Sequence, residues 1–165
     1  MERKNEARFT APNATLLGEK LRVGEGTWIG FNCLLDGQVA ELAIGKWCDI
    51  SSGAQIYTHS THLRCTERGE KLVGPVRLED HVFIGANSVI LPDTRIGHHS
   101  IVGALSVVRG TFPPNSLIVG APARVKRRLT GPESQANRQQ IAVVSRSDPR
   151  KEEASRSTRK VKARS

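Results

Sequence analysis

Aliphatic residues recur at every sixth position through the middle of the chain. From residue 78 to residue 108 they occupy Leu78, Ile84, Ile90, Ile96, Val102 and Val108. Four positions after each of the first five lies a small or β-branched residue, namely Val82, Ser88, Thr94, Ser100 and Ser106. A period of six fits neither the roughly 3.6-residue period of a helix nor the alternation of an ordinary strand. Because the period holds without a break, it predicts a repeat architecture in which each hexad forms one short strand.

The same period runs earlier in the chain, in two groups of three hexads. The aliphatic positions are Val23, Ile29, Leu35, Ile44, Ile50 and Ile56, and the small positions are Thr27, Cys33, Val39, Cys48, Ala54 and Ser60. Three hexads close a triangular coil of about 18 residues with the aliphatic side chains inside, and such coils stack about 4.8 Å apart. We therefore predict an all-β protein, a parallel β-helix of about four coils, with Leu17 starting a partial coil beneath them. The alternative is an antiparallel β-sandwich, whose strands do not keep one phase through six consecutive units.

The charge of the chain is concentrated in its last quarter. The 165 residues fit one domain of ordinary size, and the formal net charge is +9. Residues 124–165 hold thirteen Lys and Arg against four Asp and Glu, whereas residues 1–123 hold twelve of each. Within this quarter, residues 122–129 (PARVKRRL) predict a short basic C-terminal helix that closes the coil.

The segment from Thr130 onward is polar and carries few large apolar side chains. Such a segment buries too little apolar surface to offset its ordering entropy, so residues 130–165 are predicted to be a disordered basic tail beside a domain of residues 1–129. A basic tail can bind nucleic acid or an anionic surface. It has no aromatic residue for base stacking, which favours a solvated segment instead.

Three cysteines, Cys33, Cys48 and Cys65, are odd in number and lack the spacing of a metal site. Cys33 and Cys48 fall on small positions of their hexads and are predicted to pack in the wall. No run of about 18 apolar residues predicts a membrane span, and residues 1–8 are charged with no apolar stretch behind them. We expect reduced thiols and a cytoplasmic protein.

The repeat is interrupted twice, at equivalent positions. Residues 41–43 follow the hexad that starts at Leu35, and residues 62–77 follow the hexad that starts at Ile56. If three hexads make one coil, both insertions leave the prism at the same corner, one coil apart. A regular coil has no need of such loops, and functional residues concentrate on loops that a rigid scaffold holds.

The longer insertion begins in QIYTHSTHLRC, which contains His59 and His62. Imidazole titrates near neutrality, so His59 can take a proton from a hydroxyl group, although a packing or surface role is the alternative. Asp36 lies on the stacked strand one coil below Tyr57 and His59. Its carboxylate either orients the imidazole, binds a hydroxyl of an acceptor, or only shapes the turn of the LDG sequence.

The other three histidines, His81, His98 and His99, fall on hexad positions that face solvent, and we predict that they are surface residues. A zinc site of the carbonic anhydrase kind needs three histidines that converge from neighbouring coils. These three occupy different hexad positions from His59 and His62, so no metal site is expected.

Three stretches carry a resemblance to a known family: QIYTHSTH, VFIGANSVILPDTRIGHHSIVGALSVV and the closing FPPNSLIVGAPARVKRRL. Over roughly Leu17 to Leu129 the chain resembles the hexapeptide-repeat acyltransferases, and among them the galactoside- and maltose-type sugar O-acetyltransferases and the xenobiotic acetyltransferases. The resemblance implies a left-handed coil, a homotrimer, and acetyl-CoA bound in the groove between neighbouring prisms.

The resemblance also implies site residues. His59 matches the family's general base, with Asp36, Tyr57 and His62 as the candidates for holding the acceptor. The coenzyme A contacts carry over onto Ala86, Ala104, Val108, Arg109, Arg124 and Arg127. The last two guanidinium groups suit the phosphates of the coenzyme. The chain departs from many family members at Leu105, where they have glycine, and at residues 108–110, where they have Thr-Lys-Asp.

Three functions follow as hypotheses. The first is an acetyl-CoA-dependent O-acetyltransferase acting on a sugar or sugar-like hydroxyl. The sequence pairs no nucleophilic Ser or Cys with a base, so direct transfer in a ternary complex is expected. The second is the zinc β-helix, and the third is a non-catalytic scaffold that carries a basic tail.

Overall fold

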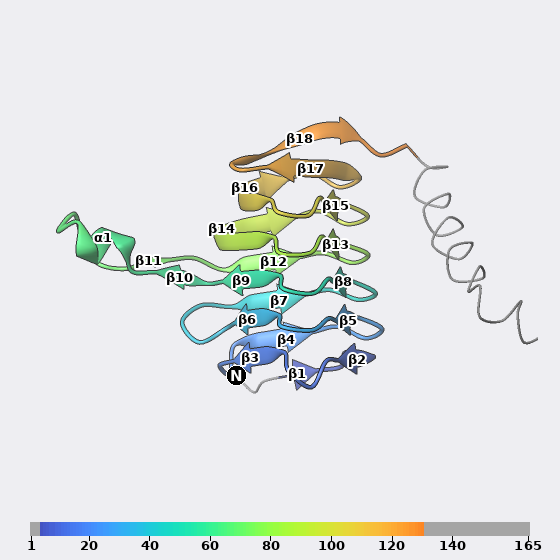
Figure 1. Ribbon diagram of the computed structural model, residues 1–165, viewed down its shortest axis with the longest axis horizontal. Helices are drawn as coiled ribbons and strands as arrows, with labels where there is room; N and C mark the ends of the chain where they lie inside the picture. The colour runs from blue at the N-terminus through green and yellow to red at the C-terminus, as the bar shows by residue number, and fades with distance from the viewer. Residues whose placement is uncertain (1–3, 131–165) are drawn as a thin grey trace, which may run out of the picture. The chain divides into compact units, whose positions relative to one another are not determined.

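The computed structural model describes residues 4–130, so residues 131–165, most of the predicted tail, lie outside the described residues. Residues 4–130 wind into a three-sided prism, a parallel β-helix of about six turns (Figure 1). The all-β prediction is confirmed, because the described range holds one short helix and eighteen strands.

Each side of the prism is a ladder of short strands. The first face contains β1 (Lys4–Asn5), β4 (Leu21–Val23), β7 (Leu42–Ile44), β12 (Val76–Leu78) and the C-terminal halves of β14 (Val89–Ile96) and β16 (Val107–Phe112). The second face contains β2 (Phe9–Thr10), β5 (Trp28–Ile29), β8 (Asp49–Ile50), β13 (Phe83–Ile84), β15 (Ile101–Val102), β17 (Ser116–Gly120) and β18 (Ala123–Arg128). The third face contains β3 (Thr15–Leu17), β6 (Leu34–Asp36), β9 (Gln55–Tyr57) and the N-terminal halves of β14 and β16. Neighbours within a face are parallel, except for β17 and β18.

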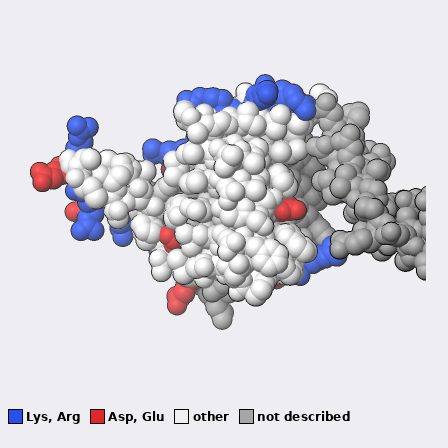
Figure 2. Space-filling view, in the orientation of Figure 1, with Lys and Arg blue, Asp and Glu red and all other residues white. Residues whose placement is uncertain are grey.

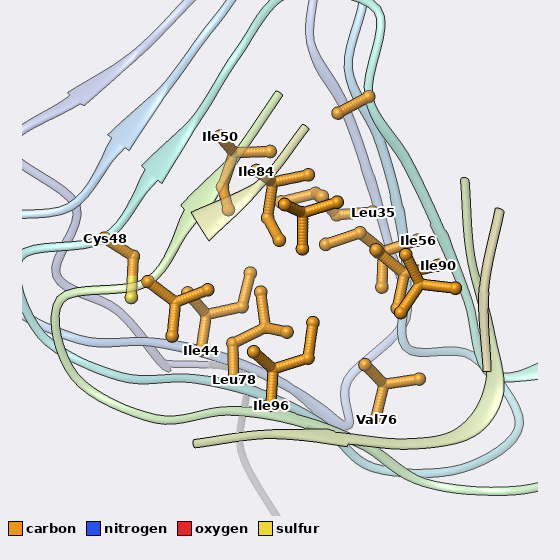
Figure 3. Close-up of a cluster of buried hydrophobic side chains, with 14 of the residues drawn as sticks. Leu35, Ile44, Cys48, Ile50, Ile56, Val76, Leu78, Ile84, Ile90 and Ile96 are labelled. Carbon is orange, nitrogen blue, oxygen red and sulfur yellow. The ribbon is translucent and has the colours of Figure 1, made fainter. Parts of the chain in front are cut away.

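The hexad aliphatics form the core, as the period predicts. All twelve are at most 3% exposed. Figure 3 shows them converging from the three faces, with Ile44, Leu78 and Ile96 from the first, Ile50 and Ile84 from the second, and Leu35, Ile56 and Ile90 from the third. Each such side chain stabilises the fold by roughly 1.5–3 kcal/mol through burial. The core is a thin aliphatic column that runs along the prism axis.

Small residues at the corners tie one turn to the next. The Ser88 hydroxyl donates to the carbonyl of Gly103 at 2.9 Å and accepts from the backbone N–H of Ser106. The Ser106 hydroxyl in turn accepts from the backbone N–H of Gly120. The turns lie so close here that a side chain on Gly85 would come within 2.4 Å of the Ala104 nitrogen. Cys33 and Cys48 are buried in the same kind of wall position, as predicted.

The predicted number of turns was wrong, because both ends of the prism extend beyond the regular hexads. The coil has about six turns and not four. Residues 4–17 form a whole lowest turn, but its interior is filled by small or partly buried residues such as Ala11 and Leu16, so no hexad period marks it. At the other end, Phe112 and Ile118 fill a last turn whose spacing departs from six.

The closing segment is a strand where a helix was predicted. β18 runs antiparallel to β17, with pairs from Gly120 and Ala123 to Ser116 and Arg128. The reason lies in β17, whose outer edge would otherwise leave backbone N–H and C=O groups without partners. The need to pair this edge outweighs the helix propensity of the ARVKRR sequence. The basic side chains of β18 also discourage the pairing of a further strand with it.

The two insertions leave the prism at one corner, as predicted. β6 and β9 are adjacent, with Asp36 opposite Tyr57, so the loops that follow them are stacked. The longer loop contains β10 (His59–Ser60), α1 (His62–Cys65) and β11 (Leu72–Val73), and β10 pairs with β11 in an antiparallel hairpin. Figure 1 shows this loop projecting away from the stack of turns.

Candidate active site

A hollow of about 330 Å³ opens where the long loop meets the third face. Its lining residues are Asp36, Tyr57, His59, Ser60, Thr61 and Leu91. The strands β6, β9 and β14 supply the floor, and β10 supplies the wall. Two candidate acceptor residues and the candidate base therefore share one hollow, whereas His62 lies just beyond it on α1.

The central contact of the hollow joins His59 to Asp36. Nδ1 of His59 lies 3.0 Å from Oδ2 of Asp36, and the carboxylate is almost fully buried. The Nδ1 atom is shielded from solvent and has no hydrogen-bond partner among residues 4–130, so its contact with Asp36 is a close approach without the geometry of a hydrogen bond. A ring nitrogen so close to a carboxylate oxygen carries the proton, because two lone pairs would otherwise face each other. The Nε2 atom is then the unprotonated, basic nitrogen.

The same carboxylate also shapes its own turn. Oδ1 of Asp36 accepts from the backbone N–H of Gln38 at 3.0 Å, while Oδ2 faces His59. One carboxylate oxygen therefore shapes the turn, and the other is left facing the imidazole and the hollow. The hydrogen bond from Gln38 fixes the position of the Asp36 carboxylate, so the carboxylate is already in place beside the imidazole of His59.

Thr58 fixes the backbone on which His59 sits. Its side chain is fully buried, its hydroxyl donates to the Asp36 carbonyl at 2.9 Å, and the same hydroxyl accepts from the backbone N–H of Ala40. The Thr58 carbonyl accepts from the N–H of Gly74 at 3.1 Å. One buried threonine therefore ties together both loops of the corner.

Ser60 is a site residue that the sequence analysis missed. The hexad count assigns it to the wall with Val39, but both are only half-buried and lie in the loops where the repeat breaks. The Ser60 hydroxyl lies 2.8 Å from Nδ1 of His62. A serine beside a potential base is therefore present, against the expectation from sequence. Unlike His59, His62 is exposed and has no carboxylate within the distances of an ion pair in the described range.

Tyr57 lies beside Asp36 on the adjacent strand, and its hydroxyl donates to Oε1 of Gln55 at 2.8 Å. The phenol edge lines the hollow next to Leu91. The two side chains give the floor of the hollow a partly apolar surface beside the polar His59 and Ser60. This mixture suits a ligand with both C–H and O–H groups.

The candidate coenzyme residues divide by burial. Ala86 and Ala104 lie on adjacent turns at the corner between the second and third faces, at least partly exposed. Val108 is fully buried in the core, so only its backbone can meet a ligand. Arg109 follows it and is exposed.

The pairing of β17 with β18 sets the direction of the two candidate phosphate-binding arginines. Arg124 lies opposite Val119, and Arg127 lies opposite Leu117. Paired residues project to the same side of a ladder, so both guanidinium groups lie on the outward side of the second face. Arg128 lies on the other side, with Nη1 3.4 Å from the Ser116 hydroxyl. Figure 2 shows the basic residues gathered along the end of the prism that β18 forms.

The three remaining histidines meet at the corner between the first and second faces. The rings of His81 and His99 stack with centroids 4.7 Å apart, and Nδ1 of His98 lies 3.0 Å from Nδ1 of His99. They are surface residues at the corner, as predicted, but their spatial clustering was missed. Within the described residues, no group of three or more His, Cys, Asp or Glu has an arrangement that could hold a metal ion.

The buried cysteines do not offer a nucleophile. Burial raises the pKa of the Cys48 thiol to about 11, and its sulfur lies 3.2 Å from the Glu79 carbonyl. Burial also raises the pKa of Cys33. Since the thiolate is the reactive form, both side chains are wall residues and not reactive groups.

The sequence and the fold match known proteins. A family model described as bacterial transferase hexapeptide (six repeats) matches residues 75–110. A hexapeptide-repeat-containing acetyltransferase of Vibrio cholerae is 35% identical, with 79% of this chain and 74% of that chain covered and a TM-score of 0.67. The same protein in complex with acetyl-coenzyme A aligns at 36% identity, covering 78% and 70% of the two chains, with a TM-score of 0.66. A maltose O-acetyltransferase of Clostridium difficile 630 is 31% identical over 68% of this chain and 60% of that chain, with a TM-score of 0.59.

The identity to the Vibrio protein over most of both chains decides the family. This chain belongs to the hexapeptide-repeat acyltransferases, as the sequence predicts. It spans 58 to 61% of the length of curated relatives from Schizosaccharomyces pombe and Staphylococcus aureus, so its own activity, substrate and partners do not follow from theirs. Over residues 4–130, no helix is long and apolar enough to cross a membrane.

Proposed function

We propose that the protein is an acetyl-CoA-dependent O-acetyltransferase that acts on a hydroxyl group of a sugar or sugar-like acceptor. The observation that carries the proposal is the pairing of His59 with Asp36 at the mouth of the long loop. The loop adds nothing to the core of the prism, yet it supplies the one wall of the hollow that holds a basic nitrogen.

In this mechanism His59 is the general base. Its Nε2 atom takes the proton of the acceptor hydroxyl as the oxygen attacks the carbonyl carbon of the thioester. The carbon–sulfur bond then breaks, and the imidazolium returns its proton to the departing thiolate. Asp36 holds Nδ1–H and stabilises the imidazolium that forms between the two transfers. General-base assistance of this kind contributes about 10²- to 10⁴-fold to the rate.

The acceptor class rests on the hollow. Tyr57 and Leu91 offer apolar surface, and Asp36, Ser60 and Thr61 offer polar groups around the base. A ring with several hydroxyl groups matches both kinds of surface. We assign Tyr57 and His62 to contacts with this acceptor, and the similar Clostridium difficile protein described above is a maltose O-acetyltransferase.

The donor side rests on small residues and arginines. Ala86 and Ala104 place small side chains at the corner, and Arg109, Arg124 and Arg127 supply positive charge near the end of the prism. A long uncharged arm with phosphates at one end matches this arrangement, since guanidinium groups bind phosphate in two-pronged fashion. Val108 contributes through its backbone alone.

The homotrimer completes the proposal. The outward ladder of the second face runs through Phe9, Trp28, Asp49, Phe83, Ile101 and Leu117, in pairing order. Trp28 and Phe83 are 43% and 37% exposed. The first face instead presents Arg22, Arg77 and Arg95. An apolar face beside a basic one suits a closed ring of three chains, with the second face turned inward to a neighbour.

The proposal also covers the handedness of the coil, the cellular location of the protein and the basic tail. We propose that the coil is left-handed, as it is in the hexapeptide-repeat family. The three cysteines form no disulfide, which fits a reducing compartment such as the cytoplasm. The basic segment of residues 130–165 is proposed to be dispensable for acetyl transfer.

A thiol-release assay tests the proposed function. Full-length protein is incubated with acetyl-CoA and a panel of sugars, amino sugars and hydroxylated antibiotics, and free coenzyme A is measured. We expect release that depends on one class of hydroxylated acceptor, with the acetyl group found on oxygen by mass spectrometry. Absence of release with every acceptor, together with absence of acetyl-CoA binding, would favour the non-catalytic scaffold.

A further inference from the structure

Leu105 is the most exposed large hydrophobic residue of residues 4–130. Its side chain is 73% exposed, against 52% for Trp47 and 49% for Phe31. Its backbone lies in the left-handed region, with φ of 59°. For a bulky non-glycine residue this conformation is a genuine outlier, and it is unfavourable because the side chain crowds its own backbone.

The neighbours of Leu105 at the same corner follow the usual chemistry. One residue per turn adopts positive φ there, namely Asn32, Gly53, Asn87 and Leu105. From Gly53 upward, each donates its backbone N–H to a carbonyl of the turn below, with Leu105 donating to Ala86 at 3.0 Å. Asn and Gly tolerate this conformation well, so Leu105 is the exception in its column.

Trp47, the other large hydrophobic residue in this conformation among residues 4–130, has a structural reason to be there. A side chain on Gly26 would come within 2.4 Å of the Trp47 ring, so the indole lies directly over the glycine of the turn below. Leu105 projects into solvent instead. Strained and exposed side chains that nothing in the fold requires are typical of sites that contact a ligand.

The surroundings of Leu105 indicate which ligand. Val119 packs over Gly103, two residues before Leu105, and Val119 is paired with Arg124. Along the prism axis, Leu105 follows β15, which lies between β13 and β17. Along this axis it therefore lies between the level of the hollow and the level of the two outward arginines.

We propose that Leu105 is a donor-binding residue that packs against the uncharged arm of acyl-coenzyme A and sets the affinity for the donor. This inference rests on the proposed function. It adds that the contact is made at the expense of folding stability, because a leucine at this corner has an unfavourable backbone conformation. The apolar side chain of Leu105 and the guanidinium groups of β18, further along the prism axis, match the two chemical parts of the coenzyme.

The test uses L105N, which places at this corner the residue that Asn87 supplies one turn below. We expect the melting temperature to rise by about 3 to 5 °C, because the strain is relieved. We expect acetyl-CoA to bind about tenfold more weakly in equilibrium calorimetry, since part of a leucine contact is lost. A purely structural residue would not give opposite changes in stability and affinity.

W47N is the matched control, because it also replaces a large hydrophobic residue at positive φ with asparagine, but at a different corner of the prism. It should lower the melting temperature by exposing the surface over Gly26 and leave the acetyl-CoA dissociation constant unchanged. Unchanged affinity or a lower melting temperature in L105N would overturn the inference. Loss of the trimer by light scattering would also overturn it, because a second chain would then be what covers Leu105.

The failure of the proposed function gives a different result. Wild-type protein that binds acetyl-CoA but transfers no acetyl group contradicts the chemistry assigned to His59 and leaves the binding test of Leu105 intact. Wild-type protein that binds no acetyl-CoA overturns both.

Discussion

The Oδ2 atom of Asp36 lies 3.0 Å from Nδ1 of His59, across two adjacent turns of the coil. The other carboxylate oxygen, Oδ1, accepts a hydrogen bond from the N–H of Gln38. Asp36 therefore shapes the turn that follows β6 and also lines the candidate active site. This contact exists because two insertions leave the prism at one corner, one above the other. It fixes which nitrogen of the imidazole is basic.

Replacing Asp36 with Asn separates orientation from acceptor binding. Asn keeps an oxygen for the turn and removes the charge that stabilises the imidazolium. We expect kcat to fall about 10²-fold with little change in KM for the acceptor. Steady-state kinetics measures both. A raised acceptor KM at unchanged kcat would instead assign Asp36 to acceptor binding.

Replacing Ser60 with Ala distinguishes direct transfer from an acyl-enzyme. The Ser60–His62 contact of 2.8 Å has the geometry of a nucleophile and its base, but His62 is exposed and has no orienting acid among the residues described. We expect S60A and H62A to keep at least about a tenth of wild-type kcat, with a raised KM for the acceptor. A mass increase of one acetyl group on Ser60 after incubation with acetyl-CoA alone, absent in S60A, would contradict direct transfer.

The arginines of β18 provide an internal control for coenzyme binding. Arg124 and Arg127 share the outward side of the strand, and Arg128 lies on the other side. R124A and R127A should raise KM for acetyl-CoA by roughly tenfold and weaken the preference for coenzyme that carries its 3′-phosphate. R128A should change neither. Equal effects in all three variants would show only a general influence of positive charge.

The proposed trimer is tested on the second face. Phe83 lies in the apolar ladder, and F83K places a charge where a neighbouring chain is expected. By light scattering at micromolar concentration, wild type should have the mass of three chains and F83K the mass of one. R77E, a charge reversal on the first face, should remain trimeric. A monomeric wild type that transfers acetyl groups would contradict the trimer.

Much of the fold follows from the sequence because each hexad repeats the same physical requirement. An inward aliphatic and a small corner residue recur, so positions such as Ile84 and Ser88 are predictable. The lowest turn escaped notice because Ala11 and Leu16 fill it without the six-residue spacing. The closing strand escaped notice because its cause is the open edge of β17, which local propensity does not contain.

The site was predictable only in part. The stacking of Asp36 below Tyr57 follows from counting hexads, because both insertions occur after a third hexad. The position of Ser60 does not follow, because the six-residue count breaks at the point where the chain leaves the prism for β10. The cluster of His81, His98 and His99 was also missed, since residues at different hexad positions can meet around a corner.

The central claim is that His59 is the base, and H59A tests it most directly. Wild type and H59A are compared for acetyl-CoA affinity, melting temperature and kcat with the best acceptor. We predict nearly unchanged affinity and melting temperature, because His59 lies outside the aliphatic core, and a kcat lower by about 10²-fold or more. An H59A variant that folds, binds acetyl-CoA and turns over at close to the wild-type rate would contradict the account.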